Sequence, residues 1–209
     1  MAPWVTSEVI REGSPSGGAG GWYAHPRHVG RVATRDSLGV RLVHAAYHTR
    51  ALSLYAKLGF TVRDFVARVT GAPLALRLPG YTVRPASLAD LAACDQACRQ
   101  VHGHDRSGEL RDAMARGSAM VVEHAGCLRG YATSVSAAGH AVGETTEAVQ
   151  ALIGAAPALE RGGFLVPLRN EALFRWRLTV GFRVAVPQTL MSRGFYQEPV
   201  GAFLPSVLY

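Results

Sequence analysis

One pattern occurs twice in this chain of 209 residues, and the copies lie 181 − 59 = 122 positions apart. Each copy has an apolar strand-like run, one polar residue, a helical segment of about three turns, Gly-Phe and another strand-like run. The polar residues are His48 and Asn170, and the Gly-Phe pairs stand at 59–60 and 181–182. Each copy is therefore predicted to be a strand, a helix, a glycine stop and a strand, and the fold must contain this unit twice.

The first copy has the periodicity of an amphipathic helix. Within 49–58, apolar residues stand at i, i+3, i+4 and i+7, and these are Ala51, Leu54, Tyr55 and Leu58. This spacing places them on one face. A strand is predicted before the helix at 41–47, and another begins at Phe60. Residues 1–39 show no such pattern and contain a Gly/Ser-rich tract, so we expect them to be poorly structured.

The rest of the chain gives a longer series of signals. They predict strands at 81–86, 119–124, 128–136 and 164–168, and helices from Asp90, at 109–116 and at 145–156. The Pro- and Gly-containing segment 73–80 reads as a linker. We therefore predict a domain over 1–72 and another over 81–209. The fold class is α/β (α+β), a mixed sheet flanked by helices.

The composition excludes several classes of protein. Basic residues number 22 and acidic residues 15, and all but Lys57 of the basic residues are arginine. No basic run is interleaved with aromatics, so we expect no nucleic-acid partner. No apolar stretch approaches the roughly 20 residues of a membrane span, and the first residues do not resemble a signal peptide. Three cysteines do not suit a disulfide scaffold, so the expected location is the cytoplasm.

Residues 47–60 read Y-H-T-R-A-L-S-L-Y-A-K-L-G-F. They resemble the late motif of the GCN5-related N-acetyltransferases (GNAT), N-x-x-A-x-x-L-Y-x-K-x-G-F, with His48 in place of the leading Asn. Residues 194–209 resemble the tail of tandem-GNAT proteins. The resemblance covers about 45–209 and implies a GNAT-like mixed sheet, with a truncated first copy and a nearly complete second copy.

The resemblance implies transfer of an acetyl group from acetyl-CoA to a primary amine of a small molecule or peptide. In the family the tyrosine at the position of Tyr55 protonates the departing thiolate; its spacing is equally that of a packing residue. Arg27 and Gly30 match part of the family's pyrophosphate loop, Q/R-x-x-G-x-G/A, and a loop without that role is the other interpretation. His48 stands at a position whose Asn binds pantetheine.

The second copy differs at the corresponding positions. Its pyrophosphate loop would contain Gly139 and Gly143, but Glu144 and Glu147 place negative charge where an anion would bind. A structural turn is the other interpretation of this segment.

Position 170 keeps the family's Asn, whereas Arg177 stands where the first copy has Tyr55. A guanidinium does not act as a proton donor, so the second copy is predicted to be a structural or substrate-side partner.

Other constellations are weaker, and the alternatives stay open. His102-Gly103-His104-Asp105 has no further ligand spacing, so no metal is expected. The base that would deprotonate the amine cannot be placed. A non-enzymatic alternative is a GNAT-like module for CoA binding or dimerisation. A homodimer is one way to complete the first site, and an in-frame extension upstream of Met1 is another.

Overall fold

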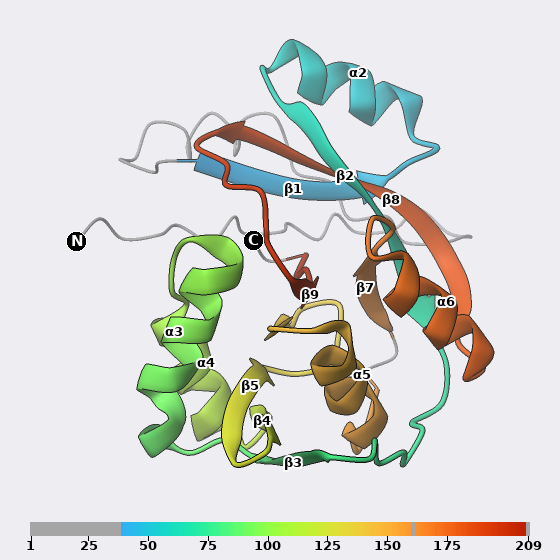
Figure 1. The fold of residues 1–209 in the computed structure, drawn as a ribbon. Helices are drawn as coiled ribbons and strands as arrows, with labels where there is room; N and C mark the ends of the chain where they lie inside the picture. Colours follow the sequence, from blue (N-terminus) through green and yellow to red (C-terminus); the bar gives the residue numbers. More distant parts are fainter. Residues whose placement is uncertain (1–38, 160–161, 208–209) are drawn as a thin grey trace. The chain divides into compact units, whose positions relative to one another are not determined.

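The computed structural model describes residues 39–159 and 162–207 (Figure 1). The chain divides into two compact units. The first unit contains the described residues up to Val66 together with 186–196, and the second contains 67–185 together with 197–206. The predicted division into 1–72, 73–80 and 81–209 stays a prediction about separately folding domains. Residues 71–80 contain no helix or strand.

The first copy of the repeat folds as predicted. Strand β1 spans Gly39–Ala45, helix α2 spans Thr49–Lys57, and strand β2 spans Thr61–Thr70. Gly59 has φ +84°, the left-handed conformation expected of a glycine that ends a helix. The inner face of α2 packs on β1 to form a small apolar core of Val40, Leu42, Ala51, Tyr55, Phe60 and Met191.

The second copy also folds as predicted, and its last strand has an unexpected neighbour. Strand β7 spans Phe164–Pro167, helix α6 Glu171–Thr179 and strand β8 Arg183–Gly194. The second half of β8 pairs antiparallel with β1, from Gly39 opposite Gly194 to Ala45 opposite Gln188. The sheet order is β1-β8-β2-β7. A strand near the C-terminus thus completes the first unit.

This pairing predicts the behaviour of a nicked chain. Protease cleavage within 71–80 should give two fragments that stay together, because the strand ladder of β1 and β8 joins residues on both sides of the cut. Size-exclusion chromatography of the nicked protein under native conditions checks this expectation. Elution of two separate fragments without denaturant would contradict it.

The second unit is built on a five-stranded antiparallel sheet, in the order β3-β4-β5-β6-β9. Its strands are β3 (Tyr81–Pro85), β4 (Met120–His124), β5 (Cys127–Ala132), β6 (Ala141–Gly143) and β9 (Ala202–Leu204). The unit contains α6 and three further helices, α3 (Leu91–His102), α4 (Ser107–Ala115) and α5 (Thr146–Ala155). A short 3-10 turn, Leu88–Asp90, precedes α3.

Alternating side chains of this sheet divide the core into two layers. Val121, Tyr131, Val142 and Phe203 pack with residues of α3 and α4. Their neighbours Val122, Ala132, Ala141 and Leu204 pack with residues of α5. Because successive strand residues face opposite sides, α3 and α4 cover one face of the sheet and α5 covers the other (Figure 1).

The α/β class and the predicted helices and strands are confirmed, with corrections in one region. The strand predicted at 128–136 ends at Ala132. The strands β6 and β9, of three residues each, were missed because so short a run shows no alternation. The loop between β5 and β6 is held by side-chain hydrogen bonds, which no hydrophobic pattern indicates.

Candidate functional site

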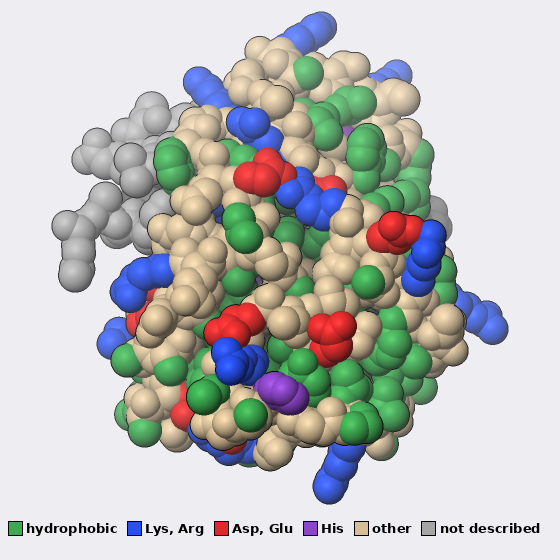
Figure 2. Space-filling model, in the orientation of Figure 1, with side chains coloured by type: hydrophobic (Ala, Val, Ile, Leu, Met, Phe, Trp, Pro, Cys, Tyr) green, Lys and Arg blue, Asp and Glu red, His purple; other side chains and the backbone are tan. Residues whose placement is uncertain are grey.

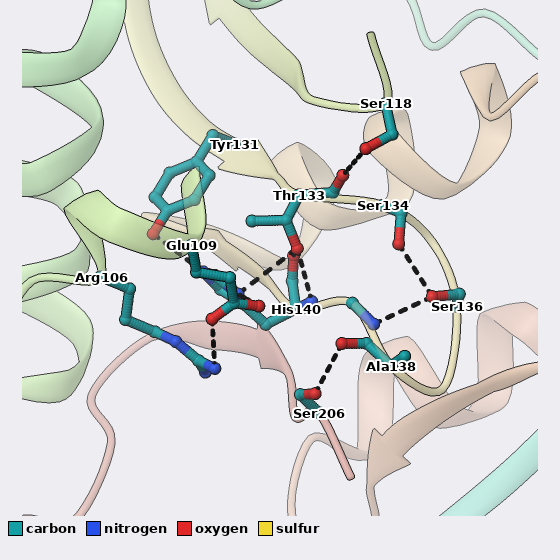
Figure 3. Close-up of polar contacts among 11 residues, drawn as sticks. Arg106, Glu109, Ser118, Tyr131, Thr133, Ser134, Ser136, Ala138, His140 and Ser206 are labelled. Carbon is teal, nitrogen blue, oxygen red and sulfur yellow. Dashed lines mark hydrogen bonds and ion pairs between the residues drawn. The ribbon is translucent and has the colours of Figure 1, made fainter. Parts of the chain in front are cut away.

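A buried polar network surrounds His140, the residue immediately before β6 (Figure 3). Helix α4 provides Glu109, and Arg106 precedes the first turn of that helix. Tyr131 comes from β5, on the sheet face that α3 and α4 cover. His140 and Tyr131 have no exposed surface. The sheet and α4 therefore bring three ionisable side chains and a phenol together in the interior.

Hydrogen bonds fix the orientation of the His140 ring. Nδ1 lies 3.1 Å from Oε1 of Glu109, and Nε2 lies 2.9 Å from the hydroxyl of Tyr131. An ionised carboxylate only accepts hydrogen bonds, so in the neutral ring Nδ1 carries the proton and donates to Glu109. Nε2 is then the acceptor for the Tyr131 hydroxyl. The backbone N–H of His140 donates to Oγ1 of Thr133 at 3.0 Å.

The Glu109 carboxylate lies between two nitrogen donors. Its Oε1 accepts from His140, and its Oε2 forms an ion pair with Nη2 of Arg106 at 2.5 Å. Oε2 is buried against the guanidinium, and the hydrogen bond and charge of Arg106 both act on it. The guanidinium therefore balances the charge of the carboxylate, and each carboxylate oxygen keeps a second lone pair.

Burial sets the protonation of this network. Burial and the positive charge of Arg106 lower the pKa of His140 to about 4, against the opposing influence of Glu109. Burial alone would raise the pKa of Glu109. The hydrogen bond from His140 and the charges of His140 and Arg106 outweigh that effect and lower it. At neutral pH the network therefore holds a carboxylate, a guanidinium and an uncharged imidazole.

Further hydrogen bonds hold the loop that carries His140 (Figure 3). The hydroxyl of Ser118 donates to Thr133 O at 2.9 Å, and that of Ser206 donates to Ala138 O at 2.8 Å. The N–H of Gly139 donates to Oγ of Ser136 at 2.9 Å. The ring of His140 is thus placed by a loop anchored at both ends.

Gly139 lets this loop fold back on itself. A Cβ at this position would lie 2.5 Å from the backbone oxygen of Ser134. The absence of a side chain at Gly139 therefore lets its backbone pack against the backbone of Ser134 in the same loop. The predicted role of Gly139 in holding a cofactor stays a prediction.

The first unit contains the residue predicted to be the general acid. Tyr55 is 3% exposed and packs against Phe60 and His44, with ring centroids 5.8 and 5.6 Å away. His48 is half-buried at the start of α2 and its side chain does not cap the helix. Arg27 and Gly30 lie outside the described residues. The acid role of Tyr55 and the cofactor roles of the other three stay predictions.

Comparison with solved structures places this arrangement in a known fold. A proposed acetyltransferase from Pyrococcus horikoshii matches with a TM-score of 0.64 and 16% identity, over 85% of this chain and 61% of that one. The fold is GNAT-like. This chain spans about three fifths of the length of that protein.

Two further structures give weaker matches. A GCN5-related N-acetyltransferase from Sphaerobacter thermophilus has a TM-score of 0.47 and 15% identity, over 83% of this chain and 66% of that one. A GNAT-family acetyltransferase from Colwellia psychrerythraea has a TM-score of 0.46 and 13% identity, over 83% of this chain and 76% of that one. No model of a protein family matches the sequence, and neither does any curated protein.

In a GNAT-like fold the start of α5 is the place predicted for the pyrophosphate of the donor, and here its polar groups bond to one another. The N–H of Glu144 donates to Arg129 O at 2.9 Å, and the N–H of Ala148 donates to Oγ1 of Thr145 at 3.3 Å. A Cβ at Gly143 would lie 2.9 Å from the Val149 side chain. Internal contacts thus engage the N–H groups of Glu144 and Ala148, and Val149 packs closely against Gly143.

The two glutamates predicted to repel the donor differ in their surroundings. Glu144 forms an ion pair with Arg129 at 2.7 Å, so its charge is balanced. Glu147 stands in the first turn of α5, where a negative charge stabilises the helix and opposes a second anion. The predicted repulsion therefore rests on Glu147.

Asn170 joins the starts of two helices in the second unit. Its Oδ1 accepts from the N–H of Leu173 at 3.0 Å and caps α6, and its Nδ2 donates to Oγ1 of Thr146 in α5 at 3.1 Å. The amide is thus engaged at both ends. To contact pantetheine as predicted, Asn170 would have to break its hydrogen bonds with Leu173 and Thr146. Asn170 and the closely packed Gly143 therefore fit a CoA donor poorly.

These contacts predict weak binding of acetyl-CoA. A ligand at a hundredfold excess over its Kd would add about 2.7 kcal/mol to the free energy of unfolding and raise the melting temperature by roughly 5 °C. Since weak binding keeps the excess over Kd small, we expect millimolar acetyl-CoA to raise the melting temperature by less than about 2 °C. Thermal melts with and without acetyl-CoA measure this. A rise of several degrees would show a donor site of ordinary affinity.

Sequence reasoning missed the network around His140. Its residues come from separate parts of the chain, and no regular sequence spacing links them as a motif would. They are Arg106, Glu109, Tyr131 and His140. The available signals were an Arg–Glu pair at i and i+3, and a tyrosine in a strand that packs on helices. Neither signal indicates chemistry until the sheet is assembled.

The surface and the remaining polar groups add little to the choice of site. On the face shown in Figure 2, acidic and basic side chains are interspersed, without a continuous basic surface. The described residues contain no group of three or more His, Cys, Asp or Glu side chains arranged to hold a metal ion. In the same part of the chain, no helix has both the length and the apolar character needed to cross a membrane.

Proposed function

We propose that this chain transfers an acetyl group from acetyl-CoA to a primary amine of a small molecule or peptide, and that Glu109 binds the amine. The observation that carries the acceptor side is the Glu109 carboxylate, which His140 and Arg106 hold in one orientation and whose oxygens can each accept a second hydrogen bond. An ammonium or amine N–H is a donor that would supply this bond. The fold supports the reaction class, and the network supplies a carboxylate held in one orientation.

The residues of the network have separate tasks in this proposal. His140 donates to Oε1 of Glu109, and Arg106 lies beside Oε2, so the carboxylate cannot rotate freely. Oε2 accepts an N–H of the bound neutral amine, which leaves the nitrogen lone pair free, and takes the proton that the nitrogen loses as the amide bond forms. The donor's thioester supplies the electrophilic carbonyl that this lone pair attacks. His140 is a positioning residue because it acts through Glu109.

The lowered pKa of Glu109 makes it a weak base. A base far below the operating pH removes a proton from an ammonium inefficiently. The fraction of substrate already present as free amine should therefore control the rate. In this proposal Glu109 first orients the nitrogen and then accepts the proton that the nitrogen loses after it attacks the thioester.

The donor side of the proposal rests on the resemblance. The resemblance assigns Arg27, Gly30 and His48 to binding acetyl-CoA and Tyr55 to protonating the thiolate, as a donor position of the first unit that is proposed apart from the Glu109 network. A homodimer would be one way to complete that site, and the protein would act in the cytoplasm. Gly139, Gly143 and Asn170 would form the second, weaker donor position.

A second candidate function is a GNAT-like module without catalysis, for CoA binding or dimerisation. One specific observation favours it. The residues at the start of α5 that would bind pyrophosphate bond to one another, as described above. Arg177 also replaces the tyrosine acid in this copy.

Mass spectrometry of acetylated products decides between the two. The full chain is incubated with millimolar acetyl-CoA and a panel of primary amines that includes polyamines, amino acids and lysine peptides. Acetyl-CoA consumption matched by an acetylated amine supports transfer. Absence of product with every amine at pH 7 to 9, from a folded protein, would favour the module without catalysis.

A further inference from the structure

The guanidinium of Arg177 is buried in the second unit and forms no hydrogen bond with any described residue. Arg177 stands in the last turn of α6, and its side chain has no exposed surface. Its Nε, Nη1 and Nη2 atoms have no hydrogen-bond partner in the described structure. The ring of Phe174, one turn earlier, lies 3.8 Å from Cζ of the guanidinium.

An unpaired buried charge is costly. Taking a guanidinium out of water costs several kcal/mol even after the protein relaxes, and a hydrogen-bonded counter-charge is what usually offsets this cost. A cation–π contact with Phe174 offsets only part of this cost. The remaining cost means that the folded chain gains stability from any anion that reaches Arg177.

Among the described residues, the acidic side chains closest to Arg177 in sequence do not supply that anion. Glu171 forms an ion pair with Arg175 on the exposed side of α6, and Glu198 forms one with Arg169. Burial alone lowers the pKa of Arg177 to about 10, with no contribution from a nearby charge. The surroundings are apolar, since Leu173 on the same face of the helix belongs to the main core.

The repeat gives this position a second, independent mark. Tyr55 holds the same place in the first copy and is also buried, at 3% exposure, on the inner face of its helix. Both copies therefore keep a side chain with a hydrogen-bonding tip at this buried position. In the second copy that tip is cationic, with five donors in a planar fork.

We propose that Arg177 is the anchor of a binding site for a small oxyanion, a carboxylate or phosphate group, in the second unit. The guanidinium fork matches two oxygens of either group with two parallel N–H···O bonds. Phe174 is half-buried and covers the guanidinium, so its side chain would move as the anion enters. This site does not depend on acetyl transfer.

Thermal melts of the full chain test the site. Sodium acetate and sodium phosphate are titrated separately at constant ionic strength set by sodium chloride. For the anion that binds, we expect a saturable rise in melting temperature of about 3 to 5 °C at tenfold excess over its Kd. Acetate and phosphate thus distinguish a carboxylate site from a phosphate site.

Three variants identify the residue responsible. Arg177→Met should melt higher than the wild type without added anion and should lose the rise. Arg177→Lys keeps the charge without the fork, so its half-saturating concentration should increase tenfold or more. Arg175→Met, on the exposed face of the same helix, should respond like the wild type. An unresponsive wild type, or an equal rise in Arg177→Met, would overturn the proposal.

Discussion

Glu109→Gln is expected to lower the rate of amine acetylation by about 100-fold or more, within the range that a general acid or base contributes. The amide keeps the size of the side chain and can still accept from Nδ1 of His140. It removes the negative charge that attracts an ammonium, and it cannot take a proton. The rate of acetylated product at saturating amine, followed by mass spectrometry, measures the effect.

Asp112→Asn is the matched control, because Asp112 lies on the same helix with an exposed side chain. Its rate should equal that of the wild type. Thermal melts of both variants separate loss of rate from loss of folding, since Glu109→Gln leaves Arg106 without its ion pair. A folded Glu109→Gln variant that keeps the wild-type rate would exclude Glu109 from the acceptor site.

The pH profile gives a second readout of the same proposal. Because the pKa of Glu109 is lowered, its carboxylate is ionised throughout the range from pH 6 to 9. The wild-type rate should therefore increase with pH until the amine itself is deprotonated, without an inflection near neutrality. An inflection near neutrality that Glu109→Gln removes would contradict this expectation.

The sequence predicted the repeat units because each unit is local. The helical spacing around Tyr55 and the glycine at 59 depend on neighbours within about four residues, and both predictions are confirmed. The strand β8 was predicted too. Its pairing with β1 could not be, because residues so far apart in sequence meet only when the sheet forms.

The network around His140 shows why the site was harder to predict than the fold. Motif reasoning needs chemistry-bearing residues at fixed spacing, and Glu109, Tyr131 and His140 come from a helix, a strand and a loop. Burial gives them their properties, because the same histidine on a surface would titrate near pH 6.5. Hydrophobic alternation in β5 could have placed Tyr131 in the core, but not its hydrogen bond to His140.

The stability of the folded chain is expected to decrease as the pH is lowered from 7.5 to 5. The folded pKa of His140 is about 4, and an unfolded histidine has a pKa near 6.5. Between these values the unfolded chain binds a proton that the folded chain does not, so acid favours unfolding. This one residue should remove about 2 kcal/mol of unfolding free energy by pH 5, and about 3 kcal/mol by pH 4.

Urea unfolding of the wild type and of His140→Gln at pH 7.5 and 5.0 isolates this effect. Glutamine can donate to Glu109 and accept from Tyr131 without titrating, so the variant should lose about 2 kcal/mol less stability than the wild type, which corresponds to about 1 M in the urea midpoint.

Burial also lowers the pKa of His44, and that contribution is common to both proteins. His124→Gln, an exposed histidine, should behave like the wild type. A hydrogen bond from Arg99 lowers the pKa of Asp105, so the stability that this carboxylate contributes is lost only as the pH falls through the pKa of an unfolded aspartate, about 3.9, and below it. Equal losses in the wild type and His140→Gln would mean that the ring of His140 is charged in the folded protein, and the network would then carry an imidazolium.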